Sequence, residues 1–237
     1  WSPVLEAVWG DVWRQGPVAW ARKAVDMGAE IVALTLRSAD PDLGNTGAAE
    51  AVKVVKQVLA AVDVPLIVYG PGIAEKDNEV LVAVADATSG QRLALGLCED
   101  KNYRTIVATC MANGHVVIPN TPIDINLAKQ LNILITDMGF PRDRILMDPT
   151  TGSLGYGLEY VYSVMERLRV AALQGDSMTA MPMILNPGRE GWRFKEAKTA
   201  EGVPAEWGEL EGRGIAWEAT TAIALLQAGA DILVMRH

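Results

Sequence analysis

Short apolar runs alternate with longer stretches of helical periodicity along most of the chain. Residues 30–36 form an almost uninterrupted apolar run of strand length, which is typical of a parallel strand covered on both faces. In residues 47–62 the apolar side chains recur at intervals of three and four, which predicts a helix with one buried face. Because strand and helix keep alternating in this way, the pattern predicts an α/β fold built on a parallel sheet.

Seven strands are expected, at residues 30–36, 65–69, 92–97, 115–118, 145–147, 181–185 and 231–235. Helices are expected at about residues 17–27, 47–62, 77–87, 102–112, 121–138, 158–172 and 214–228. Two segments fit neither pattern. Residues 1–16 are expected to form a loop with at most one turn of helix. Residues 187–211 are the longest segment in which apolar residues do not recur at regular intervals. Long loops of this kind are often functional.

Two of the predicted helices begin with capping residues. At one helix start, Asp77 or Asn78 can accept a hydrogen bond from a free backbone amide. At the other, Thr121 offers a capping hydroxyl, Pro122 suits the first helical position, and Asp124 lies three residues after Thr121. We therefore expect that helix to begin directly after Thr121.

The junction between helix and strand repeats along the chain. Gly28 and Gly229 each end a predicted helix and are followed by alanine, an acidic residue and an apolar strand. A repeated unit of helix, glycine stop and buried strand favours a TIM (β/α)8 barrel. Residues 1–237 would then form a single barrel domain, with the first strand and the last helix outside this sequence. A doubly wound open sheet is the alternative, but Gly70-Pro71-Gly72 lacks the third glycine and the following helix of a dinucleotide fingerprint.

Composition narrows the set of partners. Half of the 237 residues are hydrophobic, which is enough for one large domain, and no apolar run is long enough to cross a membrane. The formal net charge of -8 comes without a basic cluster, which argues against a nucleic-acid partner. The two cysteines, Cys98 and Cys110, match neither a disulfide framework nor a four-ligand cluster, and they fit a reducing, cytoplasmic compartment.

Polar clusters follow several of the predicted strands, at residues 69–72, 98–100, 119–121, 148–157 and 186–188. In a barrel the carboxyl ends of all strands lie at one edge, where such folds carry their chemistry. The cluster at residues 148–157 is the longest, and it combines the carboxylate of Asp148 with hydroxyls and three glycines. A plainer interpretation is that Asp148 and Pro149 only end the strand and the glycines only turn the chain.

Other reactive or aromatic residues are expected to be structural. His115 begins a strand, at the end opposite to the polar clusters, and Cys98 and Cys110 are expected to be packed thiols. Trp192 and Trp217 fit core positions. Trp192, which lies in the long polar segment, is also a candidate interface anchor.

Two long runs of sequence, at residues 121–134 and 147–160, and shorter runs at residues 162–167, 171–176, 217–219 and 229–237 resemble a known family. It is the small (delta) subunit of the corrinoid iron-sulfur protein of the CO dehydrogenase/acetyl-CoA synthase system. The resemblance covers most of the chain from about Pro17 onward and is weaker in residues 187–211. Thr121 stands where the family often has serine, and either hydroxyl can cap a helix.

The resemblance implies a barrel paired, in a heterodimer, with a larger subunit that carries a [4Fe-4S] cluster and a corrinoid-binding domain. The corrinoid (cobalamin) would lie between that domain and the carboxyl ends of the barrel strands. Its cobalt would accept a methyl group through a methyltransferase and pass it to acetyl-CoA synthase, in the reductive acetyl-CoA (Wood-Ljungdahl) pathway of carbon fixation. This chain would be a non-catalytic, accessory subunit that covers the corrinoid. Its partners would be the large subunit, the methyltransferase and CO dehydrogenase/acetyl-CoA synthase.

On this resemblance, the candidate corrinoid-binding residues are Asp148, Thr150, Thr151, Gly152, Gly155, Tyr156, Asn186 and Gly188. A corrin is a broad, largely apolar disc with amide side chains, so glycines, hydroxyls and amides can cover it without a metal ligand. A bulky side chain at Gly152 is expected to exclude the partner while leaving the barrel intact. The sequence lacks the Asp-x-His-x-x-Gly motif of cobalt ligation, and no catalytic or metal-binding residue is expected on this chain.

Two enzymes with a barrel fold are the alternatives. A pterin-binding methyltransferase would hold the pterin with Asp and Asn at strand ends, and Asp148 and Asn186 stand at suitable places. However, the strand at residues 65–69, which would be the third of the barrel, is followed by Gly70 instead of a carboxylate. The next strand is followed by Cys98 and Glu99, without an asparagine. An aldolase-like barrel would need a Schiff-base lysine in a strand, and none of the predicted strands contains a lysine.

Overall fold

The computed structural model describes residues 1–237. Its strands are β1 (Val32–Thr35), β2 (Leu66–Tyr69), β3 (Ala94–Cys98), β4 (Val116–Pro119), β5 (Ile184–Leu185) and β6 (Ile232–Leu233). Its α-helices are α1 (Pro3–Trp9), α2 (Val12–Gln15), α3 (Pro17–Asp26), α4 (Ala48–Leu59), α5 (Ala74–Ala87), α6 (Tyr103–Asn113), α7 (Ile125–Asp137), α8 (Leu158–Leu173), α9 (Pro187–Gly191), α10 (Lys195–Lys198) and α11 (Leu210–Gln227). Short 3₁₀ helices are η1 (Arg37–Ala39), η2 (Arg142–Arg144) and η3 (Ala205–Trp207).

The chain divides into two compact units. Unit 1 comprises Trp1–Asp11, Thr121–Lys129 and Met147–His237, and unit 2 comprises Val12–Asn120 and Gln130–Leu146. The single domain expected over residues 1–237 stays a prediction. No helix combines the length and the apolar character needed to span a membrane.

The sheet of unit 2 is parallel and follows the order of the chain. β1 pairs with β2, β2 with β3, and β3 with β4. In a doubly wound sheet the strand order reverses at a switch point. Four strands in sequential order, each followed by a helix, are instead the repeat that the barrel hypothesis predicts.

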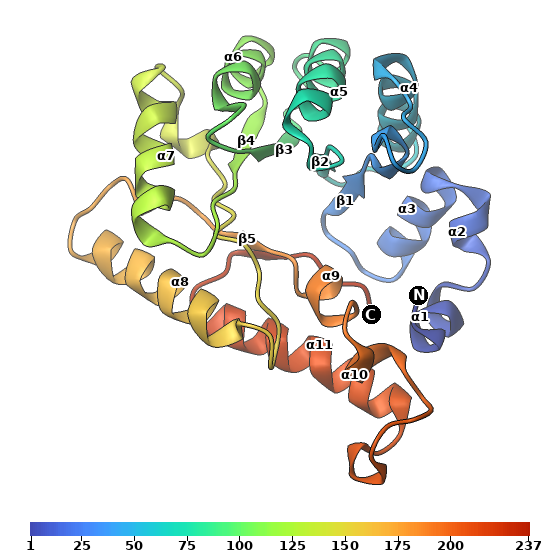
Figure 1. The fold of residues 1–237 in the computed structure, drawn as a ribbon. Coiled ribbons are helices and arrows are strands. Elements are labelled where there is room, and N and C mark those ends of the chain that lie inside the picture. The colour runs from blue at the N-terminus through green and yellow to red at the C-terminus, as the bar shows by residue number, and fades with distance from the viewer. The chain divides into compact units, whose positions relative to one another are not determined.

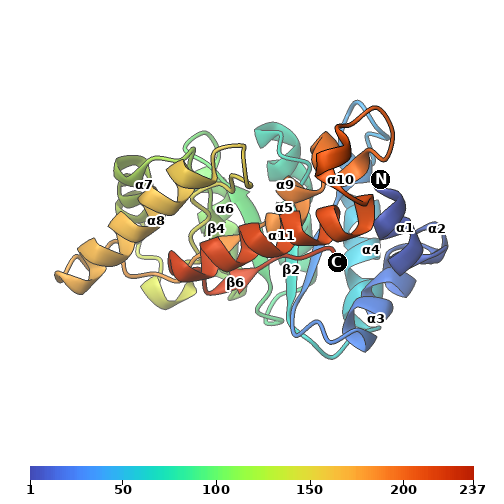
Figure 2. The ribbon, with the colours of Figure 1, turned by 90° about the horizontal axis from the view of Figure 1, so that it is seen from below.

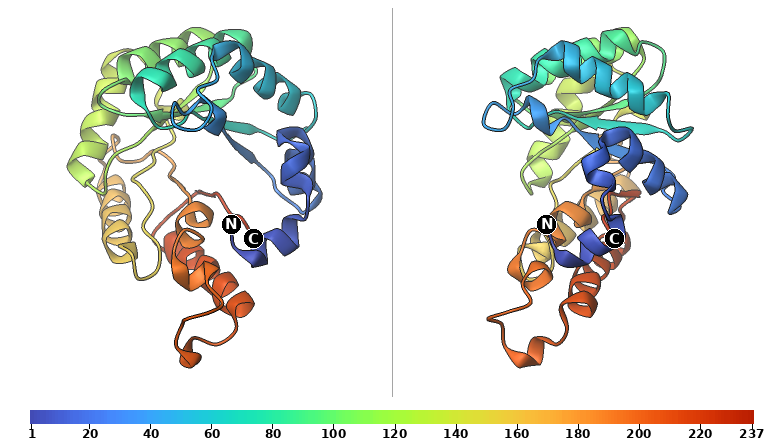
Figure 3. Two further views of the ribbon diagram at one scale, coloured as in Figure 1. Left: turned by 45° about the vertical axis from the view of Figure 1, so that its right-hand side comes forward. Right: turned by 90° about the vertical axis from the view of Figure 1, so that its right-hand side faces the viewer.

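Helices α4, α5 and α6 lie side by side and cover one face of this sheet (Figures 1 and 3). Their buried residues recur at helical spacing, as Ala51, Val55 and Val58 do in α4. β2 is buried at all four positions, which accounts for its uniformly apolar sequence. The apolar periodicity therefore predicted both the strand and the covering face of the helix correctly.

Unit 1 contains the parallel pair of β5 and β6, in which Ile184 lies beside Ile232. Its two longest helices, α8 and α11, run side by side (Figure 2). The buried residues of α8 are among those that its periodicity predicts: Val161, Val164, Met165 and Leu168.

Six of the seven expected strands form. The remaining one, at residues 145–147, contributes two isolated parallel bridges instead. Ile145 pairs with Val117 in unit 2, and Met147 pairs with Met183 in unit 1. The prediction is therefore correct in position, but the pairing on each side is limited to one residue.

Residues 1–16 form two helices, so the predicted loop is wrong. Val4, Leu5 and Trp9 are buried on one side of α1, but Gly10, with a φ of 59°, ends the helix there. Because α1 ends here and α2 begins two residues later, the apolar residues of the whole stretch do not follow one helical period.

The segment at residues 187–211 is also more structured than predicted, since it contains α9, α10 and η3. Trp192 and Ala197 are its buried side chains beyond α9, and two positions are too few to give a detectable period. Between α10 and α11 the chain extends away from the rest of unit 1 (Figure 3).

Helix α7 begins at Ile125, three residues later than predicted. The Asp124 carboxylate accepts hydrogen bonds from the backbone N–H groups of Asn126 and Leu127, at 2.7 and 3.0 Å. A carboxylate can satisfy two amides at once, so Asp124 caps the helix in place of Thr121. The backbone N–H of Thr121 donates instead to the carbonyl oxygen of Asp148, at 3.1 Å.

Helix α5 begins earlier than predicted, after Ile73, so neither Asp77 nor Asn78 is its N-cap. Asp77 lies within the first turns of the helix. Its carboxylate accepts a hydrogen bond from the backbone N–H of Gly72, at 3.1 Å, and so holds the loop that precedes the helix.

Candidate functional site

Four segments that continue from parallel strands or bridges are joined to one another in unit 1. They begin at Thr121 after β4, Asp148 after the bridge at Met147, Asn186 after β5 and Val234 after β6. Hydrogen bonds connect each of these segments to the next. All eight candidate residues lie in unit 1: Asn186 and Gly188 follow β5, and the other six follow the bridge at Met147.

Asp148 and Thr150 fix the first junction. Thr150 Oγ1 donates to the carbonyl oxygen of Thr121 at 2.8 Å, which adds to the bond from Thr121 N–H to the Asp148 carbonyl. Asp148 Oδ1 accepts from the backbone N–H of Thr150 at 2.9 Å and closes a tight turn, in which Thr150 has a φ of 66°. In these contacts both side chains bind the chain's own backbone, so they shape the site.

Thr151 and Asn186 form the second junction. Thr151 Oγ1 accepts from the backbone N–H of Asn186 at 2.7 Å, and Asn186 Oδ1 accepts from the backbone N–H of Arg189 at 2.9 Å as the N-cap of α9. The hydroxyl proton of Thr151 and the Nδ2 amide of Asn186 have no acceptor within the chain. Both side chains are half-buried. Two neighbouring segments therefore present neutral hydrogen-bond donors.

Gly152 and Gly188 are required by the chain's own packing. A Cβ at Gly152 would lie 2.5 Å from the carbonyl oxygen of Gly157, and one at Gly188 would lie 2.7 Å from the backbone nitrogen of Arg236. The backbone N–H of Gly188 donates to Val234 at 2.9 Å, which explains this close approach. The expectation that a bulky residue at position 152 would act on a partner alone is therefore wrong, because its Cβ meets the loop backbone first.

Gly155 and Tyr156 face a different part of unit 1. The Tyr156 hydroxyl lies 3.0 and 3.1 Å from the two carboxylate oxygens of Glu196, and its ring stacks on Phe194 with the centroids 3.5 Å apart. The hydrogen bond to Glu196 raises the pKa of Tyr156. Gly155 lies against the indole of Trp217. These two candidates therefore attach their loop to its neighbours and are not grouped with Thr151 and Asn186.

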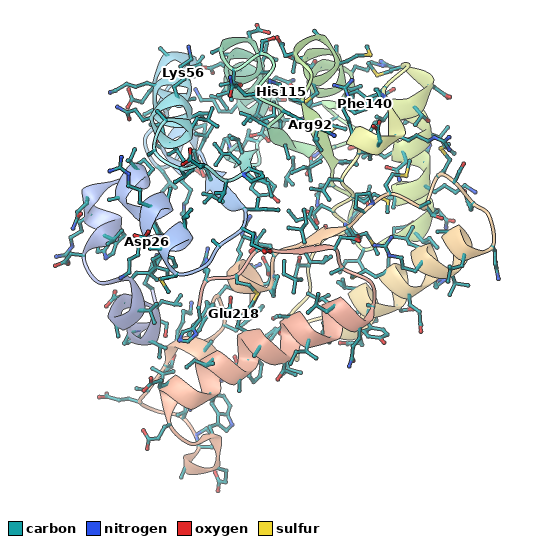
Figure 4. All side chains as sticks on the ribbon, turned by 180° about the vertical axis from the view of Figure 1, so that it is seen from behind. Asp26, Lys56, Arg92, His115, Phe140 and Glu218 are labelled. Carbon is teal, nitrogen blue, oxygen red and sulfur yellow. The ribbon has the colours of Figure 1, made fainter.

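Glu218 of α11 is a buried carboxylate that the sequence analysis did not identify as a candidate (Figure 4). It accepts hydrogen bonds from the indole N–H of Trp192 at 2.5 Å and from the backbone N–H groups of Arg236 and His237 at 2.6 and 3.0 Å. Glu218 thereby fixes the segment after β6. An acidic residue in line with the buried positions Gly214, Thr221, Ala222 and Leu225 of α11 was the signal in the sequence.

Trp192 is 2% exposed, so the hypothesis that it is an interface anchor is wrong and the core position is correct. A buried indole N–H needs an acceptor, and Trp192 finds it in Glu218. Trp217 is half-buried, and its indole nitrogen is buried without a hydrogen-bond partner.

His115, Cys98 and Cys110 are structural, as predicted. His115 is fully buried (Figure 4), its Nδ1 accepts from the backbone N–H of Leu93 at 3.2 Å, and its Nε2 lies 3.0 Å from the carbonyl oxygen of Ala85. Burial lowers the pKa of His115, which keeps the ring neutral. Burial also raises the pKa of both thiols, that of Cys110 to about 12. A protonated thiol is a poor nucleophile and a poor metal ligand.

In unit 2, the helices that follow β2 and β3 send a carboxyl and an amide back to the strand ends. The Asp77 carboxyl lies against Gly70, where an added Cβ would overlap its Oδ1. Burial raises the pKa of Asp77 to about 6, although hydrogen bonding to the Gly72 amide opposes this. The Asn102 side chain accepts from the backbone N–H of Glu99 at 2.8 Å. Both groups thus bind the backbone at those strand ends.

Comparison with known proteins tests the family resemblance. The protein-family model described as CO dehydrogenase/acetyl-CoA synthase delta subunit matches residues 6–237. The acetyl-CoA decarbonylase/synthase complex subunit delta of Archaeoglobus fulgidus is 43% identical over 227 residues, which cover 93% of this chain and 50% of that protein. The subunit delta of Methanopyrus kandleri is 41% identical over 238 residues, which cover 100% of this chain and 58% of that protein. The chain thus spans about half the length of these relatives.

Comparison with solved structures tests the fold. Dihydropteroate synthase from Thermus thermophilus matches with a TM-score of 0.60 at 16% identity, over 92% of this chain and 82% of that chain. That enzyme is a TIM barrel, so the chain has the predicted TIM-barrel fold. At this identity the likeness shows the fold alone. The match to the family model over nearly the whole length agrees with the sequence resemblance, and the chain belongs to the CO dehydrogenase/acetyl-CoA synthase delta subunit family.

Proposed function

We propose that this chain is the barrel part of a delta subunit that covers a corrinoid held by a larger partner subunit. The partner would also hold a [4Fe-4S] cluster. In the cytoplasm, the pair would transfer a methyl group from a methyltransferase to CO dehydrogenase/acetyl-CoA synthase. The chain would be an accessory subunit without catalytic residues of its own. Family membership supports the assignment to this complex.

The observation that carries the corrinoid proposal is the pair of donors on Thr151 and Asn186 that bind nothing within the chain. The rim of a corrin displays neutral amide side chains, whose carbonyl oxygens accept hydrogen bonds from hydroxyl and amide groups. A neutral donor set fits a neutral rim, because a charged side chain buried there without a partner would be costly. Thr151 Oγ1 and Asn186 Nδ2 would hold the rim, while Asp148 and Thr150 hold the backbone around them.

A bound corrinoid supplies a cobalt atom that can accept and release a methyl group. The residues of this chain would orient the disc by its rim and exclude water from one of its faces. A neutral hydrogen bond contributes only about 0.5 to 1.5 kcal/mol net. Because two such bonds hold a large ligand weakly, we expect the isolated chain to bind no corrinoid tightly.

The test is to purify the chain together with whatever co-elutes, to record the visible spectrum and to identify the partner by mass. The expected result is a stoichiometric corrinoid spectrum for the complex and none for the chain alone. A corrinoid bound stoichiometrically by the chain alone, or a stable partner without a corrinoid, would contradict the proposal.

Two substitutions test the donor pair itself. Asn186→Asp keeps an oxygen that caps α9 but replaces the amide donors with a carboxylate, so it should weaken binding of the corrinoid-loaded partner by roughly tenfold. The melting temperature of the chain should not change. Thr151→Ser keeps the hydroxyl and is the matched control, for which binding should be unaffected.

The pterin-binding methyltransferase is not favoured. The family model that matches the chain is that of a delta subunit. In addition, the carboxyl of Asp77 and the amide oxygen of Asn102 at the ends of β2 and β3 accept hydrogen bonds from the backbone.

A further inference from the structure

Residues 152–157 form a compact loop, called the flap below. The carbonyl oxygen of Ser153 accepts hydrogen bonds from the backbone N–H groups of Tyr156 and Leu158, at 2.8 and 3.2 Å. Gly152 and Gly157 lie at the two ends of the flap, and Gly157 has a φ of 90°. One hydrogen bond within the flap and one from the first residue of α8, Leu158, therefore shape this loop, and glycines connect it to the rest of the chain.

The contacts that hold the flap on its neighbours are made by three of its residues. The backbone N–H of Leu154 donates to Thr221 Oγ1 of α11 at 3.1 Å, and Gly155 lies against the ring of Trp217. The Tyr156 ring stacks on Phe194, and its hydroxyl contacts Glu196, but the residue is 41% exposed, so water competes for this hydrogen bond. Each of these contacts contributes only a little free energy by itself.

The docked flap leaves two buried polar atoms without a hydrogen-bond partner. They are the hydroxyl oxygen of Ser153, in a residue with 0% exposure, and the indole nitrogen of Trp217, whose ring carbons lie against Gly155. A buried polar group without a partner costs more free energy than a neutral hydrogen bond contributes. The docked flap thus has one hydrogen bond to α11, while one polar atom in the flap and one in a ring that it contacts stay unpaired.

We propose that the flap is a movable cover, which exchanges between a docked state on α11 and a lifted state in which Ser153 and Trp217 are hydrogen-bonded. In the lifted state their partners are water or groups of a bound molecule. The glycines at positions 152 and 157 act as the hinges. The use of this motion in covering a corrinoid rests on the proposed function. The motion itself does not, so its test requires only the chain.

A buried water molecule bound to either atom is the competing explanation, because such waters satisfy buried polar groups. The two explanations predict opposite effects when the Ser153 hydroxyl is removed. If the hydroxyl is unpaired, its removal stabilises the docked flap. If it binds a buried water, its removal leaves that water with one partner fewer and loosens the flap.

The test is hydrogen exchange of the ¹⁵N-labelled chain, followed by NMR. We expect the amide of Leu154 and the indole N–H of Trp217 to exchange with equal protection, because one opening event exposes both. Their protection should be far below that of a core amide such as Leu168 in α8. Ser153→Ala should slow both exchange rates roughly tenfold.

Two further variants complete the experiment. Ser163→Ala, on the exposed face of α8, is the matched control and should change neither rate. Thr221→Val removes the acceptor of the Leu154 amide and should speed both rates by roughly fivefold.

The proposal is overturned if Ser153→Ala leaves the two rates unchanged or raises them, or if both protons are as protected as the core amides. Loss of partner binding with intact flap exchange would reject the proposed function and not the flap. Intact partner binding together with exchange rates that differ from those expected would reject only the flap proposal.

Discussion

Two buried carboxyl groups, one in each unit, are used in opposite ways. Glu218 in unit 1 is 1% exposed and accepts three N–H donors, from Trp192 and from the segment after β6. Asp77 in unit 2 is 2% exposed, accepts from the backbone N–H of Gly72, and is repelled by Glu99. Burial alone therefore does not decide whether a carboxyl group stabilises the fold. The number of hydrogen-bond donors around the carboxyl group decides it.

The difference predicts opposite responses to substitution. Removal of Glu218 would leave three donors without their acceptor, so unit 1 should lose stability. Removal of the charge on Asp77 would relieve an unfavourable burial, so unit 2 should gain stability at neutral pH.

Glu218→Ala should have the largest effect, a loss of about 3 to 5 kcal/mol in the free energy of unfolding, because hydrogen bonds to a charged acceptor are lost together. Urea denaturation followed by circular dichroism measures it. Glu218→Gln, which keeps one acceptor oxygen, should lose about half as much. A loss below about 1 kcal/mol for the alanine variant would show that water replaces the carboxylate.

Asp77→Asn should have the next largest effect, and its sign depends on pH. The pKa of Asp77 is raised by burial from 3.8 to about 6 in the folded chain, so the folded state binds the proton more tightly than the unfolded state. Its contribution to stability is complete below about pH 4 and is lost as the pH rises through about 6. Asp77→Asn should remove this loss and raise the free energy of unfolding at pH 7 to 8 by up to roughly 3 kcal/mol.

Melting curves between pH 4 and 8 test this prediction. Asp26→Asn, at an exposed position, is the matched control and should leave the pH profile unchanged. If the Asp77→Asn profile follows that of the unsubstituted chain at every pH, Asp77 does not titrate in this range.

Gly152→Ala and Gly70→Ala extend the comparison from carboxyl groups to glycines. A methyl group at position 152 meets the backbone of Gly157, whereas one at position 70 meets the side chain of Asp77. A side chain can move aside more easily than backbone. We therefore expect the free energy of unfolding to fall by about 2 to 3 kcal/mol for Gly152→Ala and by about 1 to 2 kcal/mol for Gly70→Ala. Thermal unfolding measures both, and an equal or reversed order would contradict the explanation.

Thr151→Val should have the smallest effect on stability. The valine removes the acceptor for the backbone N–H of Asn186, which costs about 1 kcal/mol. Affinity for the corrinoid-loaded partner should fall more than stability does, and Thr151→Ser should restore both. A loss of stability without a loss of affinity would mean that Thr151 serves only the chain.

The sequence predicted the alternating elements well, because burial of an apolar face leaves a period that neighbouring residues share. Six of seven strands and the buried face of α8 were correct. The start of α7 was not, because Thr121 and Asp124 are both suitable caps and the choice depends on a distant partner. The carbonyl oxygen of Asp148 binds the Thr121 amide, and Asp124 caps the helix.

The family and the fold class follow from the sequence by itself, because long matching runs and a repeated helix-to-strand junction are local features of the chain. The positions of the eight candidate residues, after β5 or after the bridge at Met147, are likewise set by local pattern. Tertiary structure alone decided which polar groups remain available. The hydroxyl proton of Thr151 and the Nδ2 amide of Asn186 have no acceptor in the chain, whereas Glu218 and Asp77 bind donors from the folded chain. Hydrogen bonds between residues far apart in sequence depend on three-dimensional proximity, and no periodicity records them.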